Sequence, residues 1–87
     1  MPERPLTTPT PAAVREALAR ALPRLPQDPT ADLFERGIID SLRLVEAIAA
    51  LETAFGTTFE PEDLRQANFS TLQRMVQTVE RILARSR

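Results

Sequence analysis

Apolar residues recur every three or four positions soon after the N-terminus. Val14, Ala17, Leu18, Ala21 and Leu22 follow this spacing, which is typical of one face of an amphipathic helix. Thr10 offers an N-cap hydroxyl and Pro11 suits a first helical turn, whereas Pro23 disfavours the α conformation in the residue before it. The pattern therefore predicts a helix over residues 11–22.

A second helix is predicted over residues 41–55. Asp40 or Ser41 can serve as its N-cap, and Gly56 stands just past its end, where helices often stop. The following segment, Glu60-Pro61-Glu62-Asp63-Leu64, places proline and acidic residues in the first turn of a short third helix.

The last helix is predicted to open at Ser70, because Ser70-Thr71-Leu72-Gln73 has the pattern of a capping box. Its buried stripe is formed by Leu72, Met75, Val76, Val79, Ile82 and Leu83. No segment alternates with the period of two that strands show. We therefore expect an all-α fold, a small four-helix bundle of three longer helices and one short helix.

The first two helices are joined by a long loop, residues 23–40. Its apolar residues Leu33, Phe34, Ile38 and Ile39 are expected to hold it against the core. Loops of this length inside a small domain are usually functional. Residues 1–9 are rich in Pro and Thr without periodicity, so we predict a disordered tail there and one folded domain over residues 10–87.

The helix predicted over residues 41–55 carries two apolar stripes. At about 100° per residue, one stripe is formed by Leu44, Ile48, Leu51 and Phe55. The other is formed by Leu42, Val45 and Ala49, with Ser41, Glu46 and Glu52 between and around the two. A second stripe flanked by carboxylates indicates a surface on which another protein docks. The alternative is that this helix is central and buried on both sides.

The residue types that are missing exclude most catalytic chemistry. The chain contains no His, Cys, Lys, Tyr or Trp, which removes the usual general base, the thiol nucleophile, the Schiff-base amine and the common zinc ligands. Ser41 has no residue type available to activate it as a nucleophile, but it is well placed as a substrate. We therefore expect a protein that is not an enzyme and holds no metal.

Charge is unevenly distributed along the chain. Residues 32–63 carry a net charge of −6 and residues 64–87 a net charge of +4, within a total of −1. The acidic segment favours encounter with basic protein surfaces over nucleic acid, although such a segment can equally be a solvated face. The alternative of a small DNA-binding domain depends on Arg65, Arg74, Arg81, Arg85 and Arg87 alone.

No membrane partner is expected, since no apolar run approaches the roughly 20 residues of a membrane span. The N-terminus lacks the apolar core of a secretory signal, which favours the cytoplasm. Nothing in the sequence indicates self-association, so a monomer is expected.

Residues 33–46, LFERGIIDSLRLVE, resemble the 4′-phosphopantetheine attachment region of acyl and peptidyl carrier proteins. The resemblance continues through Leu51-Glu52, Phe55-Gly56, Phe59-Glu60-Pro61-Glu62-Asp63 and Asn68-Phe69-Ser70-Thr71-Leu72, and so covers about residues 30–85. It implies the acyl-carrier fold, in which the modified serine opens the second helix after a long loop.

The same resemblance implies the function. A phosphopantetheinyl transferase would transfer 4′-phosphopantetheine from coenzyme A to Ser41, making the chain a phosphoprotein that carries an aminoacyl or acyl thioester. An adenylating ligase or acyltransferase would load the thiol, and downstream biosynthetic enzymes would take the cargo. Partner contacts are expected at Asp40, Leu42, Val45, Glu46, Ala49 and Glu52.

Two departures narrow the class of carrier. Two residues, Ile38 and Ile39, separate Gly37 from the Asp-Ser pair, whereas fatty-acid carriers usually have one, and Arg43 is basic where that helix is often acidic or neutral. Both features favour a discrete aminoacyl or D-alanyl carrier in a specialised pathway, and the lack of flanking domains favours a stand-alone chain over one excised from a longer protein. The alternatives are a polyketide or fatty acyl carrier and an unmodified, carrier-like interaction module.

Overall fold

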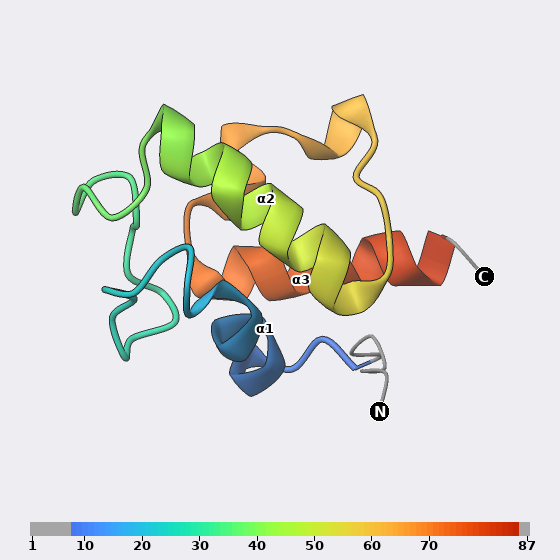
Figure 1. The fold of residues 1–87 in the computed structure, drawn as a ribbon, viewed down its shortest axis with the longest axis horizontal. Coiled ribbons are helices and arrows are strands. Elements are labelled where there is room, and N and C mark those ends of the chain that lie inside the picture. The colour runs from blue at the N-terminus through green and yellow to red at the C-terminus, as the bar shows by residue number, and fades with distance from the viewer. Residues whose placement is uncertain (1–7, 86–87) are drawn as a thin grey trace.

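Three α-helices and two short 3₁₀ turns form the fold in the computed structural model, which describes residues 8–85 (Figure 1). Their order is α1 (Pro11–Leu18), α2 (Ser41–Phe55), η1 (Pro61–Asp63), η2 (Gln66–Phe69) and α3 (Leu72–Arg85). Residues 8–85 contain no strand, so the all-α class is confirmed for this part of the chain. None of the helices in that range is long and apolar enough to cross a membrane. Of the predicted tail, residues 1–7 lie outside the described residues.

The helix α1 ends at Leu18, four residues earlier than predicted. Its backbone tightens there, because the Ala19 amide donates to the carbonyl of Glu16 (3.3 Å), three residues back, instead of to the carbonyl of Arg15, four residues back. Leu22 is nevertheless buried, and its amide donates to Leu18 O (2.7 Å). The apolar spacing therefore continued one turn beyond the regular helix.

The predicted short third helix is present as a 3₁₀ turn, η1, so residues 8–85 contain three α-helices and a bundle of four helices is not confirmed. Asp63 closes a single 3₁₀ turn in η1, and Leu64 then leaves the helical region with φ −87° and ψ 43°. Arg65 is extended, with φ −92° and ψ 140°, before η2 begins. The non-helical backbone of Leu64 and Arg65 thus separates η1 from η2 and prevents one continuous helix.

The predicted capping box at Ser70 is also wrong. The hydroxyl of Thr71 accepts a hydrogen bond from the amide of Arg74 (3.0 Å), so Thr71 caps α3 one residue later. Ser70 instead donates its hydroxyl to the carbonyl of Ala67 in η2 (3.0 Å). The buried stripe of α3 is confirmed apart from Leu83, which is half-buried, and it includes the unpredicted Thr78.

The core lies where the three helices meet. α1 packs against both α2 and α3, and α2 crosses α3 in Figure 1. Ala47, Leu51 and Phe55 form the buried face of α2, whereas Leu44 and Ile48 are only half-buried. The predicted core stripe is therefore displaced around the helix toward Ala47, a small residue that lets the neighbouring helices approach closely.

Candidate functional site

The start of α2 is fixed by Asp40, which settles the choice between the two predicted N-caps. Asp40 is extended, and its Oδ1 accepts a hydrogen bond from the amide of Arg43 at 2.9 Å. Ser41 is the first helical residue and is exposed. Within residues 8–85 its hydroxyl makes no hydrogen bond. The side chain that the sequence singled out for modification is therefore not used to cap the helix.

The loop before Ser41 is held in place through Leu33. The Leu33 amide donates to Ser70 O (2.8 Å), and the Leu33 carbonyl accepts from the amides of Ile38 (2.9 Å) and Ile39 (3.1 Å). Gly37 adopts a φ of 72°, a conformation that favours glycine, at the bend between these bonds. Leu33 and Ile39 are buried, as predicted for loop anchors, while Phe34 and Ile38 are half-buried. These contacts set the direction in which the chain enters α2.

The second apolar stripe of α2 faces outward. The side chains of Leu42 and Val45 are 69% and 64% exposed, and Ala49 and Glu46 are exposed as well. The alternative that α2 is buried on both sides is therefore wrong. Leu64 is a further exposed large apolar residue, which the sequence analysis did not single out.

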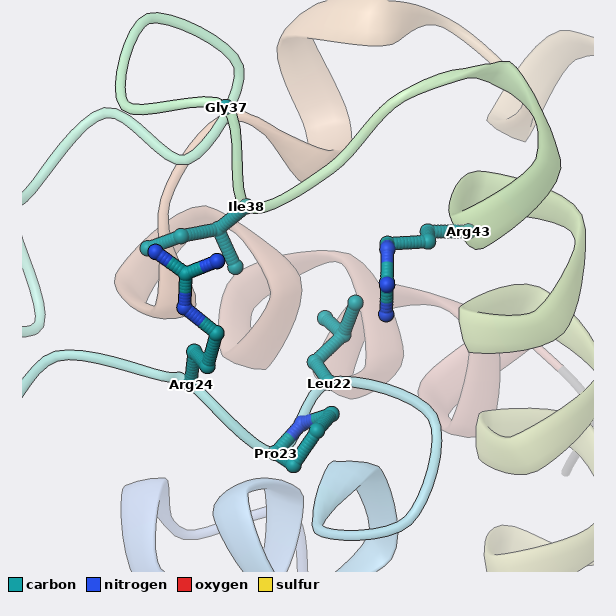
Figure 2. Close-up of a pocket in the computed structure, with 6 residues that line it drawn as sticks. All are labelled: Leu22, Pro23, Arg24, Gly37, Ile38 and Arg43. Carbon is teal, nitrogen blue, oxygen red and sulfur yellow. The ribbon is translucent and has the colours of Figure 1, made fainter.

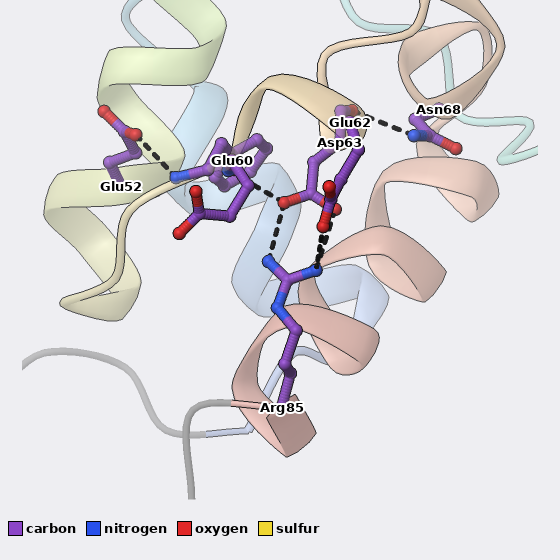
Figure 3. Close-up of polar contacts among 7 residues, drawn as sticks. Glu52, Glu60, Glu62, Asp63, Asn68 and Arg85 are labelled. Atoms are coloured by element: carbon purple, nitrogen blue, oxygen red, sulfur yellow. Dashed lines mark hydrogen bonds and ion pairs between the residues drawn. The ribbon is translucent and has the colours of Figure 1, made fainter.

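Glu52 differs from the other predicted contact residues because its carboxylate already has a partner. Its Oε2 accepts a hydrogen bond from the amide of Phe59 at 2.8 Å (Figure 3). Gly56 ends α2 in the left-handed conformation, and its amide donates to the carbonyl of Glu52. Phe59 in turn stacks on Phe69, with ring centroids 5.7 Å apart. Glu52 thus joins the end of α2 to the segment leading to η1.

A buried carboxylate joins η1 to the end of α3. Asp63 is 2% exposed and lies against Arg85, with Nη2–Oδ2 at 2.7 Å and Nη1–Oδ1 at 3.3 Å (Figure 3). The amide of Glu60 also donates to Oδ2 (2.8 Å). The hydrogen bonds from Arg85 hold the pKa of the Asp63 carboxyl below its ordinary value, against the opposing effect of burial. The side chain of Asn68 completes this cluster by donating to the Asp63 carbonyl (2.9 Å).

Arg43 lies at a small hollow that the sequence analysis did not anticipate (Figure 2). The hollow has a volume of about 70 Å³ and is lined by Leu22, Pro23, Arg24, Gly37, Ile38 and Arg43. No spacing rule places the segment after α1 beside the first turn of α2, so only the fold could show it.

The predicted site residues therefore fall into two groups. Ser41, Leu42, Val45, Glu46 and Ala49 are exposed on α2. Asp40 and Glu52 are engaged in hydrogen bonds that shape the two ends of the same helix. Two of the predicted recognition carboxylates thus have a structural role as well.

Comparison with known proteins places the chain in a family. The family described as "Phosphopantetheine attachment site" matches residues 12–79, which include the start of α2 and most of α3. The D-alanyl carrier proteins of Lactococcus lactis subsp. cremoris (strains MG1363 and SK11) are 33% identical to the chain over 54 residues, 62% of this chain and 68% of each relative. The D-alanyl carrier protein of L. lactis subsp. lactis (strain IL1403) matches to the same extent. No solved structure matches significantly. The chain belongs to the phosphopantetheine-binding carrier family, whose cofactor is covalently attached 4′-phosphopantetheine, and it is related to D-alanyl carrier proteins.

Proposed function

We propose that Ser41 is the residue that receives 4′-phosphopantetheine and that the chain serves as a carrier for an aminoacyl group. The observation that carries this proposal is the exposed Ser41 hydroxyl at the first position of α2, left out of the helix cap by Asp40. An exposed serine on a fixed helix end can be presented to a transferase without unfolding any part of the domain.

The surroundings of Ser41 fit a phosphodiester. The first amides of a helix lack intrahelical partners and favour an anion, so a phosphate at the start of α2 lies in a favourable field. The bonds to Leu33 and the cap by Asp40 hold this helix end in one orientation. When bound, the cofactor supplies a thiol on a flexible arm, which carries the cargo as a thioester in a chain that has no cysteine of its own.

The partner surface is proposed to be the outward stripe of α2. Leu42 and Val45 offer apolar contacts, Ala49 extends them along the helix, and Glu46 adds a carboxylate. The proposed partners are a phosphopantetheinyl transferase, an adenylating ligase or acyltransferase, and downstream biosynthetic enzymes. Glu52 is expected to contribute less than Glu46, because its carboxylate already accepts the Phe59 amide.

The proposed cargo is an amino acid because the relatives are D-alanyl carriers. The test is to incubate the phosphopantetheinylated chain with ATP, D-alanine and a D-alanine-activating ligase and then to weigh the intact protein. A gain of one alanyl group supports the aminoacyl cargo. A modified chain that accepts only acyl groups from an acyltransferase would instead establish the fatty acyl or polyketide alternative.

The attachment itself is tested by intact-protein mass spectrometry after reaction with coenzyme A and a promiscuous transferase. The wild type is expected to gain one phosphopantetheine and Ser41→Ala none. Ser70→Ala is the matched control: the Ser70 hydroxyl donates a hydrogen bond to the carbonyl of Ala67, and the variant is expected to be modified like the wild type. A Ser41→Ala variant that still gains the group would reject the proposed site, and an unmodified wild type would favour the unmodified interaction module.

A further inference from the structure

The hollow beside the first turn of α2 combines an apolar wall with two cations. Leu22 is buried at its base, and Pro23 and Ile38 add carbon surface. The side chains of Arg24 and Arg43 reach into the space from different segments (Figure 2). No acidic residue lines the hollow.

Neither arginine is paired with a carboxylate within the described residues. Salt bridges in residues 8–85 involve Arg85 alone, and no side-chain hydrogen bond of Arg24 or Arg43 occurs there. Two guanidinium groups that share one hollow repel each other and keep several donors unsatisfied by protein groups. A ligand with oxygen acceptors and a compact apolar part would satisfy both features.

We propose that this hollow seats a segment of the pantetheine arm, an inference that rests on the proposed attachment at Ser41. The arm has a dimethyl-bearing carbon close to its phosphate, and carbonyl oxygens farther along. The branched carbon, which lies close to the phosphate, would pack on Ile38, the lining residue nearest to Ser41 before it in the sequence. The methylene groups and carbonyl oxygens farther along the arm would enter the hollow, where the methylene groups would contact Leu22 and the oxygens would accept hydrogen bonds from Arg24 and Arg43.

The location of the hollow relative to Ser41 limits how the arm can reach it. Ile38 is three residues before Ser41, and Arg43 is two residues after it in the same helical turn. Side chains two residues apart on a helix point about 200° from each other, so the arm has to pass over the N-terminal end of α2.

The size of the hollow limits how much of the arm it can hold. A volume of about 70 Å³ is far below the several hundred Å³ of pockets that enclose whole ligands. The hollow therefore holds one segment of the arm and leaves the thiol end outside, accessible to partner enzymes.

The inference is tested by NMR on the chain carrying a ¹³C-labelled pantetheine arm, after mass spectrometry has confirmed one arm per chain. We expect nuclear Overhauser contacts from the arm methyl groups to the side chain of Ile38 and from the arm methylene groups farther along to the side chain of Leu22. In the double variant Arg24→Gln/Arg43→Gln these contacts should fall to background. The control Arg20→Gln, an exposed arginine that does not line the hollow, should keep them.

The outcomes separate the two proposals. A wild-type chain that gains no arm overturns the proposed function and this inference together. A fully modified chain whose arm gives no contact to the hollow, with amide shifts confined to residues next to Ser41, overturns the inference and leaves the carrier function standing. Contacts that persist in the double variant also contradict the role given to the arginines.

Discussion

The carboxylate of Asp40 accepts the amide of Arg43 at 2.9 Å, and this bond leaves the serine between them outside the helix cap. It separates two roles that the sequence alone could not divide between Asp40 and Ser41. The cap is structural and belongs to the aspartate, whereas the serine hydroxyl remains accessible for chemistry.

This division of roles predicts different stability effects at adjacent positions. Asp40→Ala should lower the free energy of unfolding by about 1 kcal/mol, because the Arg43 amide loses its acceptor. Ser41→Ala should change it by no more than about 0.5 kcal/mol, as for an ordinary surface substitution. Urea unfolding followed by circular dichroism measures both, and Asp40→Asn, which keeps a capping oxygen, is the control. Equal losses at the two positions would contradict the assignment of the cap.

The pair formed by Asp63 and Arg85 predicts a dependence of stability on pH. The folded-state pKa of Asp63 is lowered, so its contribution is complete above the unfolded value of about 3.9 and is lost as the pH falls through the folded value. Asp63→Asn should lower the free energy of unfolding near neutral pH by about 1.5–3 kcal/mol, the range for hydrogen bonds to charged groups.

The measurement is a series of urea unfolding curves between pH 7 and pH 2. The wild type should lose stability at the acid end more steeply than Asp63→Asn, since the variant has no carboxyl to protonate at this position. Glu62→Gln is the control, because that carboxylate is largely exposed and 3.7 Å from Arg85. Parallel pH profiles for the wild type and Asp63→Asn would show that the buried pair does not cause the dependence.

Glu52 should behave as a structural residue. Glu52→Ala removes the acceptor of the Phe59 amide and should cost about 1 kcal/mol. Glu52→Gln keeps a side-chain oxygen and should cost less. Glu46→Ala, six residues earlier on the same helix and exposed, should leave the unfolding midpoint unchanged. If Glu52→Ala is as stable as Glu46→Ala, the hydrogen bond to Phe59 contributes nothing measurable.

The outward stripe of α2 should affect partners more than stability. Val45→Ser is expected to change the free energy of unfolding by less than about 0.5 kcal/mol, whereas Leu51→Ala, in the core, should cost about 2–5 kcal/mol. The same Val45→Ser should lower kcat/KM for phosphopantetheinylation by about tenfold, the equivalent of 1.4 kcal/mol at an interface contact. Glu16→Gln, exposed on α1, is the control for transfer kinetics. Normal kinetics for Val45→Ser would remove this residue from the docking surface.

The sequence predicted best what local chemistry determines. The helix α2 has both predicted ends, because Asp40 and Gly56 are strong start and stop signals. The end of α1 and the short third helix were predicted less well, since each depends on how the following loop is held. Arg15, for instance, donates to the carbonyl of Pro26 (2.8 Å) and draws that loop back along α1.

The site could be predicted only where it lies on one helix. Spacing along residues 41–55 was sufficient to identify the outward stripe that contains Leu42 and Val45. It could not reveal the contact of Asp63 with Arg85, which lie 22 residues apart, or the meeting of Arg24 with Arg43 at one hollow. Such pairs depend on the packing of segments that are distant in sequence.

The attachment of phosphopantetheine to Ser41 is tested by peptide mapping of the chain after reaction with coenzyme A and a promiscuous transferase. Cleavage after arginine releases residues 37–43, GIIDSLR, in which Ser41 is the one hydroxyl-bearing residue. We expect tandem mass spectrometry to find the phosphopantetheine on this peptide and on no other. Finding it on residues 66–74, QANFSTLQR, or finding no modified peptide with a demonstrably active transferase, would contradict the assignment of Ser41 as the attachment residue.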